Sequence, residues 1–236
     1  MIKKYILKNF TDLANPILGT KIMSCSDEFF APAKRLINPQ KPIYKDNIFD
    51  NHGKWMDGWE TRRKRSKGHD FVIIKLGKPG KIKNIDIDTS YFNGNQPEYA
   101  QLEGCYSNNN LKKAKWIKIT RKNKIKPNFN NFFKSSTSKT LTHVRLNIFP
   151  DGGVARLRLF GNIDLSLQRI SKNKNFDLAS IINGSQIIAC SDEHFGNVNN
   201  IILPTKSINM GDGWETRRRR GKGFDWVIIK LGFSSY

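Results

Sequence analysis

The sequence contains DGWETRRKRSKGHDFVIIKLG at residues 57–77, and DGWETRRRRGKGFDWVIIKLG returns at residues 212–232. The two stretches are identical at 17 of 21 positions. Each ends in a short β-branched apolar run, which is typical of a buried strand. A repeat of this length indicates that one structural unit has been duplicated. The chain of 236 residues is therefore interpreted as one and a half copies of an all-β unit.

A second motif sets the boundaries of the two copies. Residues 25–28, Cys-Ser-Asp-Glu, match residues 190–193, so the two motifs lie ten residues closer together in the second copy. We predict an N-terminal extension at residues 1–20, a first β-sandwich at 21–161, a polar linker at 162–185 and a partial second β-sandwich at 186–236. Residues 78–161 have no counterpart in the second copy, so we expect the second repeat to be incomplete through C-terminal truncation.

Alternating apolar and polar residues predict the strands of the first copy. Val144, Leu146 and Ile148 alternate with polar residues, and similar alternation or short apolar runs occur at residues 72–74, 85–88, 116–119 and 155–159. Turn residues separate the runs, and a tight turn is predicted at 149–153. One helix is expected over Phe29–Ile37, with Ser26 or Asp27 as its N-cap. The predicted fold class is all-β, with tandem jelly-roll β-sandwich repeats that are galactose-binding-like.

Composition excludes several classes of protein. Hydrophobic residues make up 38% of the chain, too many for wholesale disorder. No apolar run reaches the roughly 18 residues that a membrane span requires, and no signal peptide is recognised, so we expect a cytoplasmic protein without a membrane partner. Cys25, Cys105 and Cys190 form no CxxC pair and are interpreted as buried apolar side chains. The histidines lack metal-ligand spacing, so we expect no metal and no cofactor.

The formal net charge of +21 favours a nucleic-acid partner. Much of this charge is Lys mixed with Asn and Ile, as at residues 122–126 and 172–175, which compositional drift would produce without any ligand. The main alternative explanation of the charge is a positive electrostatic field that favours the binding of small anions. The clustered Arg62–Arg65 could bind phosphates, but no basic amphipathic helix or aromatic stacking platform accompanies it. Nucleic acid is therefore not the partner that we expect.

The stretch Asp57–Arg63 places two carboxylates, a Trp and two Arg directly before a buried strand. Charged side chains at the mouth of a strand can gather at a concave site. The structural alternative is that Trp59 caps the core while the acids pair with the arginines. His69 is a separate candidate, because its counterpart is Phe224 and only the first copy has an ionisable group there. If His69 is not catalytic, it is a surface or half-buried histidine beside Asp70.

Four long motifs follow one another in the chain. They are Ser26-Asp27-Glu28-Phe29-Phe30-Ala31, Asp57-Gly58-Trp59-Glu60-Thr61-Arg62-Arg63, Asp88-Thr89-Ser90-Tyr91-Phe92-Asn93-Gly94-Asn95 and Phe149-Pro150-Asp151-Gly152-Gly153-Val154-Ala155-Arg156. Together they resemble the allantoicase family over residues 22–161 and again over 187–232. The resemblance implies tandem jelly-roll domains that assemble into homo-oligomers. It also implies an enzyme of purine breakdown that hydrolyses allantoate to ureidoglycolate and urea.

Allantoate is a small carboxylate that carries two ureido groups on one carbon, and this chemistry indicates candidate residues. A bidentate Arg suits the carboxylate, and the candidates are Arg62, Arg63 and Arg156. Amides and carboxylates suit the ureido groups, and the candidates are Asn93, Asn95, Asp27 and Glu28. Expelling urea needs a proton donor and a base that activates water, and the candidates are Asp57, Glu60, His69 and Asp88.

Three other functions stay open at this point. One is a non-catalytic β-sandwich module that binds sugars or other small ligands, since this fold serves both purposes. Another is a nucleic-acid binder, for which affinity would fall steeply with salt. The last is an inactive, truncated enzyme. Release of urea from allantoate separates the enzyme from all three.

Overall fold

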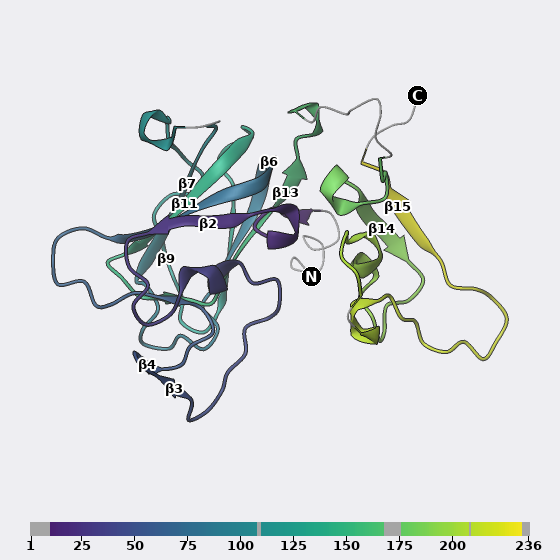
Figure 1. Cartoon of the computed structure of the whole chain (residues 1–236), viewed down its shortest axis with the longest axis horizontal. Coiled ribbons are helices and arrows are strands. Elements are labelled where there is room, and N and C mark those ends of the chain that lie inside the picture. Colours follow the sequence, from purple (N-terminus) through teal and green to yellow (C-terminus); the bar gives the residue numbers. More distant parts are fainter. Residues whose placement is uncertain (1–9, 108–109, 168–175, 208, 233–236) are drawn as a thin grey trace. The chain divides into compact units, whose positions relative to one another are not determined.

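The computed structural model describes residues 10–107, 110–167, 176–207 and 209–232. These residues form two compact units (Figure 1). The first unit is Asp12–Gly161, and the second contains the described residues from Asn162 onward together with Phe10 and Thr11. The four sequence motifs that carry the family resemblance all lie in the first unit.

The first unit is built from strands, which confirms the predicted all-β class. Among the described residues of the whole chain there is no α-helix, and the helical turns are short 3-10 helices. The strands up to Ile163 are β1 (Thr11–Asp12), β2 (Lys21–Cys25), β3 (Phe49–Asp50), β4 (Gly53–Lys54), β5 (Trp59–Glu60), β6 (Asp70–Asp88), β7 (Tyr99–Cys105), β8 (Ile117–Lys118), β9 (Asn123–Lys124), β10 (Asn130–Lys134), β11 (Leu141–Phe149), β12 (Gly153–Val154) and β13 (Arg156–Ile163). The 3-10 helices there are η1 (Pro16–Leu18), η2 (Ala33–Ile37) and η3 (Leu111–Lys113).

Strand β6 organises the sheet of the first unit. The main strand order is β1-β13-β6-β11-β7-β8, and β2, β9 and β10 pair outside this path. The first half of β6 lies between β2 and β11 (Figure 1). Its second half pairs with β10, where Ile85 lies opposite Phe133. One long strand thus serves two groups of partners and carries the core residues Val72, Ile74 and Ile85, all fully buried.

Residues 72–74 and 85–88 are both in strand as the sequence predicted, but the prediction that they form separate strands was wrong. The structure has one strand of 19 residues, β6, that runs through Pro79-Gly80. The pairing with β11 is irregular there, because the register passes from Lys75 opposite His143 to Gly80 opposite Leu141. A proline without an N–H is tolerated where the ladder is interrupted. A proline and a glycine therefore mark an irregular pairing and not a turn.

The predicted helix is also corrected. Only Ala33–Ile37 is helical, as the 3-10 helix η2, and its N-cap is Pro32 and not Ser26 or Asp27. Leu36 and Ile37 are buried as the apolar pattern requires, whereas Phe29 is 42% exposed. Pro32 has an extended backbone and cannot continue a helix from upstream, so the helix begins after it.

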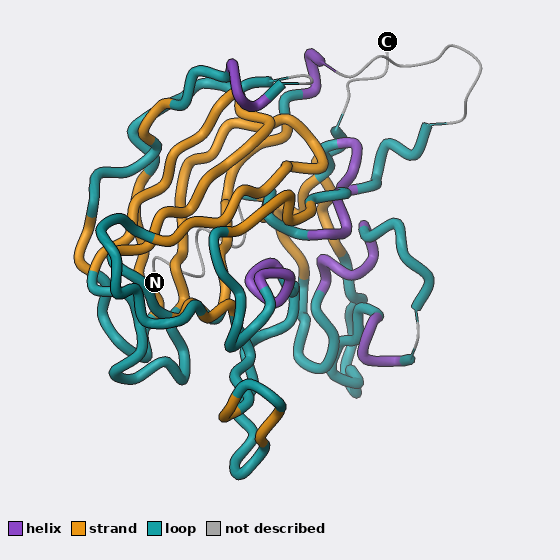
Figure 2. Tube along the Cα trace, turned by 60° about the vertical axis from the view of Figure 1, so that its left-hand side comes forward, coloured by secondary structure: helices purple, strands orange, loops and turns teal. Residues whose placement is uncertain are grey.

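A hairpin formed by β3 and β4 projects from the first unit (Figures 1 and 2). Phe49 pairs with Lys54 and Asp50 with Gly53. The hairpin lies in the segment where the sequence of the second copy is ten residues shorter. Among the described residues, it is therefore found only in the first repeat.

The second unit contains a two-stranded sheet of β14 (Gln186–Cys190) and β15 (Val227–Lys230). The 3-10 helices here are η4 (Leu165–Leu167), η5 (Ile181–Asn183), η6 (Val198–Ile202) and η7 (Met210–Asp212). Ile187, Val198 and Ile202 form a small buried cluster against which Trp214 packs. Cys105 is buried as predicted, whereas Cys25 and Cys190 are only half-buried, so the prediction was wrong for these two. Within the described residues, no helix has the length and apolar character needed to cross a membrane.

Candidate functional site

A cavity of about 480 Å³ lies beside β5 in the first unit. Its walls come from the end of β5 and the residues after it, the segment that precedes β7, and the turn between β11 and β12. The wall side chains that carry charge or can bind a ureido group are Glu60, Arg63, Lys64, Asn95, Glu98 and Asp151. Small-molecule sites commonly have volumes of about 300–1,000 Å³, so this cavity is of suitable size.

Strand β5 directs Glu60 toward the cavity. Glu60 and Trp59 pair with Gly153 and Val154 of β12, and Ala31 bridges to Glu60 as well. Trp59 is fully buried, and its Nε1 donates to the backbone oxygen of Asp27 at 2.8 Å. Because side chains alternate along a strand, burying Trp59 turns Glu60 to the opposite side. Trp59 is thus part of the buried core, as the structural alternative proposed, and the neighbouring carboxylate is available to the cavity.

The turn at residues 149–153 completes the wall. The backbone nitrogen of Gly152 donates to Thr61 Oγ1 at 3.1 Å, and the backbone nitrogen of Gly153 donates to the backbone oxygen of Asn95 at 2.7 Å. Gly152 has a φ of +133°, a backbone region that favours glycine. These bonds hold Asp151 and Asn95 at the same cavity as Glu60.

Glu60 and Asn95 are directly bonded. Asn95 Nδ2 donates to Glu60 Oε1 at 2.8 Å. Burial raises the pKa of Glu60 above its usual value, and the hydrogen bond from Asn95 offsets part of this effect. A carboxyl group with a raised pKa keeps its proton at higher pH, which suits a proton donor.

Two cations line the cavity, and they differ in their partners. Lys64 Nζ contacts Asp70 Oδ1 at 2.8 Å, and the Lys64 backbone nitrogen donates to Asp151 Oδ2 at 2.6 Å. Arg63 is exposed and has no hydrogen bond or ion pair with any other residue that the structure describes. Arg63 is therefore the cation on this wall that is available to an anion.

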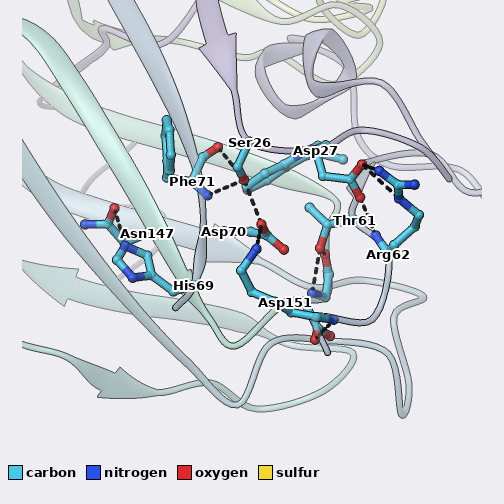
Figure 3. A network of polar contacts seen from close by, with 12 residues as sticks. Ser26, Asp27, Thr61, Arg62, His69, Asp70, Phe71, Asn147 and Asp151 are labelled. Atoms are coloured by element: carbon cyan, nitrogen blue, oxygen red, sulfur yellow. Dashed lines mark hydrogen bonds and ion pairs between the residues drawn. The ribbon is translucent and has the colours of Figure 1, made fainter. Parts of the chain in front are cut away.

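A polar network lies next to these residues (Figure 3). Asp27 Oδ2 accepts from the Arg62 backbone nitrogen at 2.6 Å, and Asp27 Oδ1 lies 3.0 Å from the Arg62 guanidinium. Ser26 Oγ donates to Asp70 Oδ1 at 2.9 Å and accepts from the Phe71 nitrogen at the same distance. The network ties the start of β6 to the residues that follow β2.

The second repeat reproduces the backbone and serine bonds of this network, whereas the Arg217 guanidinium lies 3.0 Å from His194 Nδ1. Arg217 donates its backbone N–H to Asp192 Oδ2 at 2.6 Å, and Trp214 Nε1 donates to the backbone oxygen of Asp192 at 2.7 Å. Ser191 Oγ donates to Asp225 Oδ1 at 2.8 Å. These bonds recur although no counterpart of the turn at 149–153 lies among the described residues of the second repeat. These contacts build the scaffold of the motif, and they hold the equivalent Asp27 and Arg62 in the first repeat.

Asp57 and Arg156 form a buried ion pair away from the cavity walls. Arg156 Nη2 lies 2.7 Å from Asp57 Oδ2, and the side chains are 1% and 9% exposed, respectively. Arg156 also donates to the backbone oxygens of Asp57 and Gln40 at 2.9 and 3.0 Å. Both residues were candidates on sequence grounds, and the structure commits them to each other and to the backbone.

Three more candidates lie outside the cavity walls. Glu28 Oε2 accepts from the Ala33 nitrogen at 2.8 Å, at the start of η2. Asp88 is buried, and its Oδ1 accepts from the backbone nitrogen and hydroxyl of Ser90 at 2.8 and 2.6 Å. Asn93 is exposed. Of the sequence-predicted site residues, the structure brings Glu60, Arg63 and Asn95 together at one cavity.

His69 lies near the cavity but does not line it. Its Nε2 is 3.2 Å from Asn147 Oδ1 (Figure 3), and its ring packs at 4.5 Å from the ring of Phe149. Phe149 directly precedes Pro150, which is part of the cavity wall. His69 therefore packs against Phe149, the residue that leads into the turn.

Sequence reasoning missed several wall residues. They are Phe30, Thr61, Lys64, Gln96, Glu98 and Asp151. The signal for Asp151 was its position inside the fourth motif, between a predicted strand and the next. Glu98 and Gln96 stood just past the third motif and carried no signal of their own. Among the residues that the structure describes, no group of three or more His, Cys, Asp and Glu could hold a metal ion.

The fold and the site together define a repeat-built β-sandwich protein with a small polar cavity in its first repeat. The sequence model of the allantoicase repeat matches residues 11–164 and again residues 176–236. The chain belongs to the allantoicase family.

Known relatives support this membership. A probable allantoicase from Acinetobacter baylyi is 50% identical over 227 residues, which cover 96% of this chain and 67% of the relative. A probable allantoicase from Pseudomonas fluorescens is 48% identical, with 95% of this chain and 69% of the relative covered. The crystal structure of allantoicase from Saccharomyces cerevisiae has a TM-score of 0.80 at 37% identity, covering 98% of this chain and 71% of the other. The family, the all-β class and the tandem repeat expected from the sequence are confirmed.

Proposed function

We propose that this chain is an allantoicase, a hydrolase of linear amidines that converts allantoate and water to ureidoglycolate and urea in the cavity beside β5. One observation supports the cavity as the site. Glu60, with its raised pKa and its hydrogen bond from Asn95, shares the cavity walls with the available guanidinium of Arg63. A proton donor, an amide and a cation are the groups that this substrate requires.

The carboxylate of allantoate pairs with Arg63 in this proposal. A guanidinium offers two parallel N–H donors that match the two oxygens of a carboxylate. Arg62 and Arg156 are bonded to Asp27 and Asp57, so Arg63 is preferred over them. Asn95 Oδ1 accepts from a ureido N–H while its Nδ2 remains on Glu60, which places the substrate beside the carboxyl group.

Glu60 supplies the proton for the departing urea. The bond between the central carbon and one ureido nitrogen breaks, Glu60 protonates that nitrogen, and water adds its hydroxyl to the carbon. The proton released by water returns to the Glu60 carboxylate, so atoms and charge balance. Asp151 receives the role of orienting this water, because it lines the same cavity and is fixed by the Lys64 N–H at 2.6 Å.

Urea release from allantoate by the purified chain tests the proposal. We expect Glu60→Gln to lower kcat by about a hundredfold or more, the range of a lost general acid. Arg63→Ala should raise KM, because it removes an anion contact. Asn93→Ala is the control. Asn93 is an exposed amide in the same loop as Asn95, but it does not line the cavity.

Two results would count against this assignment. Binding of allantoate without urea release by the wild-type chain favours the non-catalytic ligand-binding module. Full activity in Glu60→Gln moves the proton donor elsewhere. Homo-oligomeric assembly and a cytoplasmic location stay predictions, which light scattering of the purified chain and cell fractionation test.

A further inference from the structure

A second hollow adjoins the proposed substrate cavity. It has a volume of about 600 Å³, and Phe30, Arg63 and Lys64 line both spaces. Its own walls add Arg62, Arg65 and Ser66, and two carboxylates, Asp27 and Asp70. Four consecutive cations, Arg62–Arg65, therefore face one hollow, which we call the basic pocket.

Both carboxylates of the basic pocket already have cationic partners. Asp27 lies 3.0 Å from the Arg62 guanidinium, and Asp70 lies 2.8 Å from Lys64 Nζ. Arg63 and Arg65 are exposed and form no hydrogen bond or ion pair with the rest of the described chain. Two guanidinium groups are thus left without a counter-charge on the same wall.

We propose that the basic pocket binds a small oxyanion, of which inorganic phosphate is the simplest, between Arg63 and Arg65. Guanidinium groups match the paired oxygens of such anions, and the Ser66 hydroxyl adds a further donor on the wall. Nothing in the hydrolysis of allantoate requires this ligand, since that substrate has a single carboxylate. The inference therefore goes beyond the proposed function.

The second repeat retains the charge of the basic pocket. Positions 217–220 are all Arg, so each of the four cations has a positive counterpart, including Arg219 in place of Lys64. Arg219 contacts Asp225 at 3.1 Å, as Lys64 contacts Asp70. Ser66 and His69, by contrast, are replaced by Gly221 and Phe224. Positive charge is the property that the two loops share.

One consequence rests on the proposed function. Arg63 lines both spaces, so an oxyanion held by Arg63 competes with the carboxylate of allantoate for the same guanidinium. Inorganic phosphate should then raise the KM for allantoate and leave kcat unchanged. Arg65→Ala should weaken this inhibition without lowering kcat.

Calorimetric titration of the full chain with inorganic phosphate tests the pocket independently of turnover. The titrations use an Arg220→Ala background, which disables the equivalent loop of the second repeat. Arg65→Ala in this background should weaken phosphate binding by about fivefold or more. Lys67→Ala is the matched control, because it removes one exposed positive charge from the same loop outside the basic pocket, and it should change the affinity by less than about twofold.

Equal weakening by Arg65→Ala and Lys67→Ala would overturn the proposal, because it would mean that only the diffuse positive field attracts phosphate. Tighter binding of a single-stranded oligonucleotide that depends equally on both residues would overturn it in favour of nucleic acid. The two proposals can fail separately. If the chain releases no urea but loses phosphate binding specifically in Arg65→Ala, the enzymatic assignment is contradicted and the basic pocket is supported.

Discussion

Glu60 is the residue through which the cavity responds to pH. Burial keeps its folded-state pKa above the usual 4.5, so the folded protein retains this proton to higher pH than the unfolded chain. Stability therefore declines as pH rises from about 4.5 through the folded pKa. Glu60→Gln removes this ionisation, so its free energy of unfolding should rise relative to wild type over that interval. Guanidinium chloride melts at about pH 4 to pH 8 measure the difference. A constant difference across the series would show that Glu60 is not buried in this way.

Asp57 and Arg156 contribute to stability and not to the cavity, because their ion pair is buried and lies away from the cavity walls. Asp57→Ala leaves the Arg156 guanidinium, 1% exposed, without its anion. Removing one partner of a buried pair costs about 3–5 kcal/mol, so we expect a destabilisation of that order in guanidinium chloride. Asp50→Ala, on the exposed β3–β4 hairpin, is the control and should change stability by less than about 0.5 kcal/mol. Loss of activity at full stability in Asp57→Ala would instead return Asp57 to the catalytic candidates.

At the scale of elements, the short pairing of β5 with β12 depends on a glycine. A Cβ on Gly153 would lie 2.0 Å from Cε1 of Phe92, a ring that is fully buried. Gly153→Ala should therefore push β12 away from Glu60 and destabilise the protein by about 1–3 kcal/mol, the usual range for overpacking. The melting temperature and kcat should fall together. Gly221→Ala is the control, since nothing lies within 4 Å of the added carbon and it should melt as wild type does.

The strands that the sequence predicted correctly are those in which a clear period coincides with burial. In strand β11, Val144, Leu146 and Ile148 are all fully buried as predicted, although the intervening Asn147 is also buried, at 2% exposure. The prediction was wrong where local signals competed with tertiary pairing. Pro79-Gly80 favours a turn locally, yet β2, β10 and β11 hold the surrounding residues in one strand. Pairing between distant segments decided that outcome, and the period of a short run cannot encode it.

At the scale of the whole molecule, the duplication and the family were readable because long motifs recur in order. The candidate site was readable only in part. Glu60, Arg63 and Asn95 reach one cavity, whereas chemically equal candidates hold each other or the backbone, namely Asp27, Arg62, Asp57 and Arg156. Residue type and spacing do not reveal which carboxylate meets which guanidinium. The internal repeat helps, because bonds that recur in both copies identify scaffold.

The two repeats also allow one comparison of stability with a built-in control. Val72-Ile73-Ile74-Lys75 and Val227-Ile228-Ile229-Lys230 are identical in sequence, so their intrinsic amide exchange rates are closely matched. The first lies in β6 between β2 and β11, whereas β15 pairs only with β14 among the described strands, and Ile228 is 52% exposed. Amides with one partner strand open at lower free energy, so hydrogen exchange should be about tenfold or more faster in β15. Mass spectrometry of peptides covering each stretch measures both rates in one sample. Equal protection would mean that β15 is covered as fully as β6 in solution. The smaller number of partner strands of β15 would then not lower its local stability.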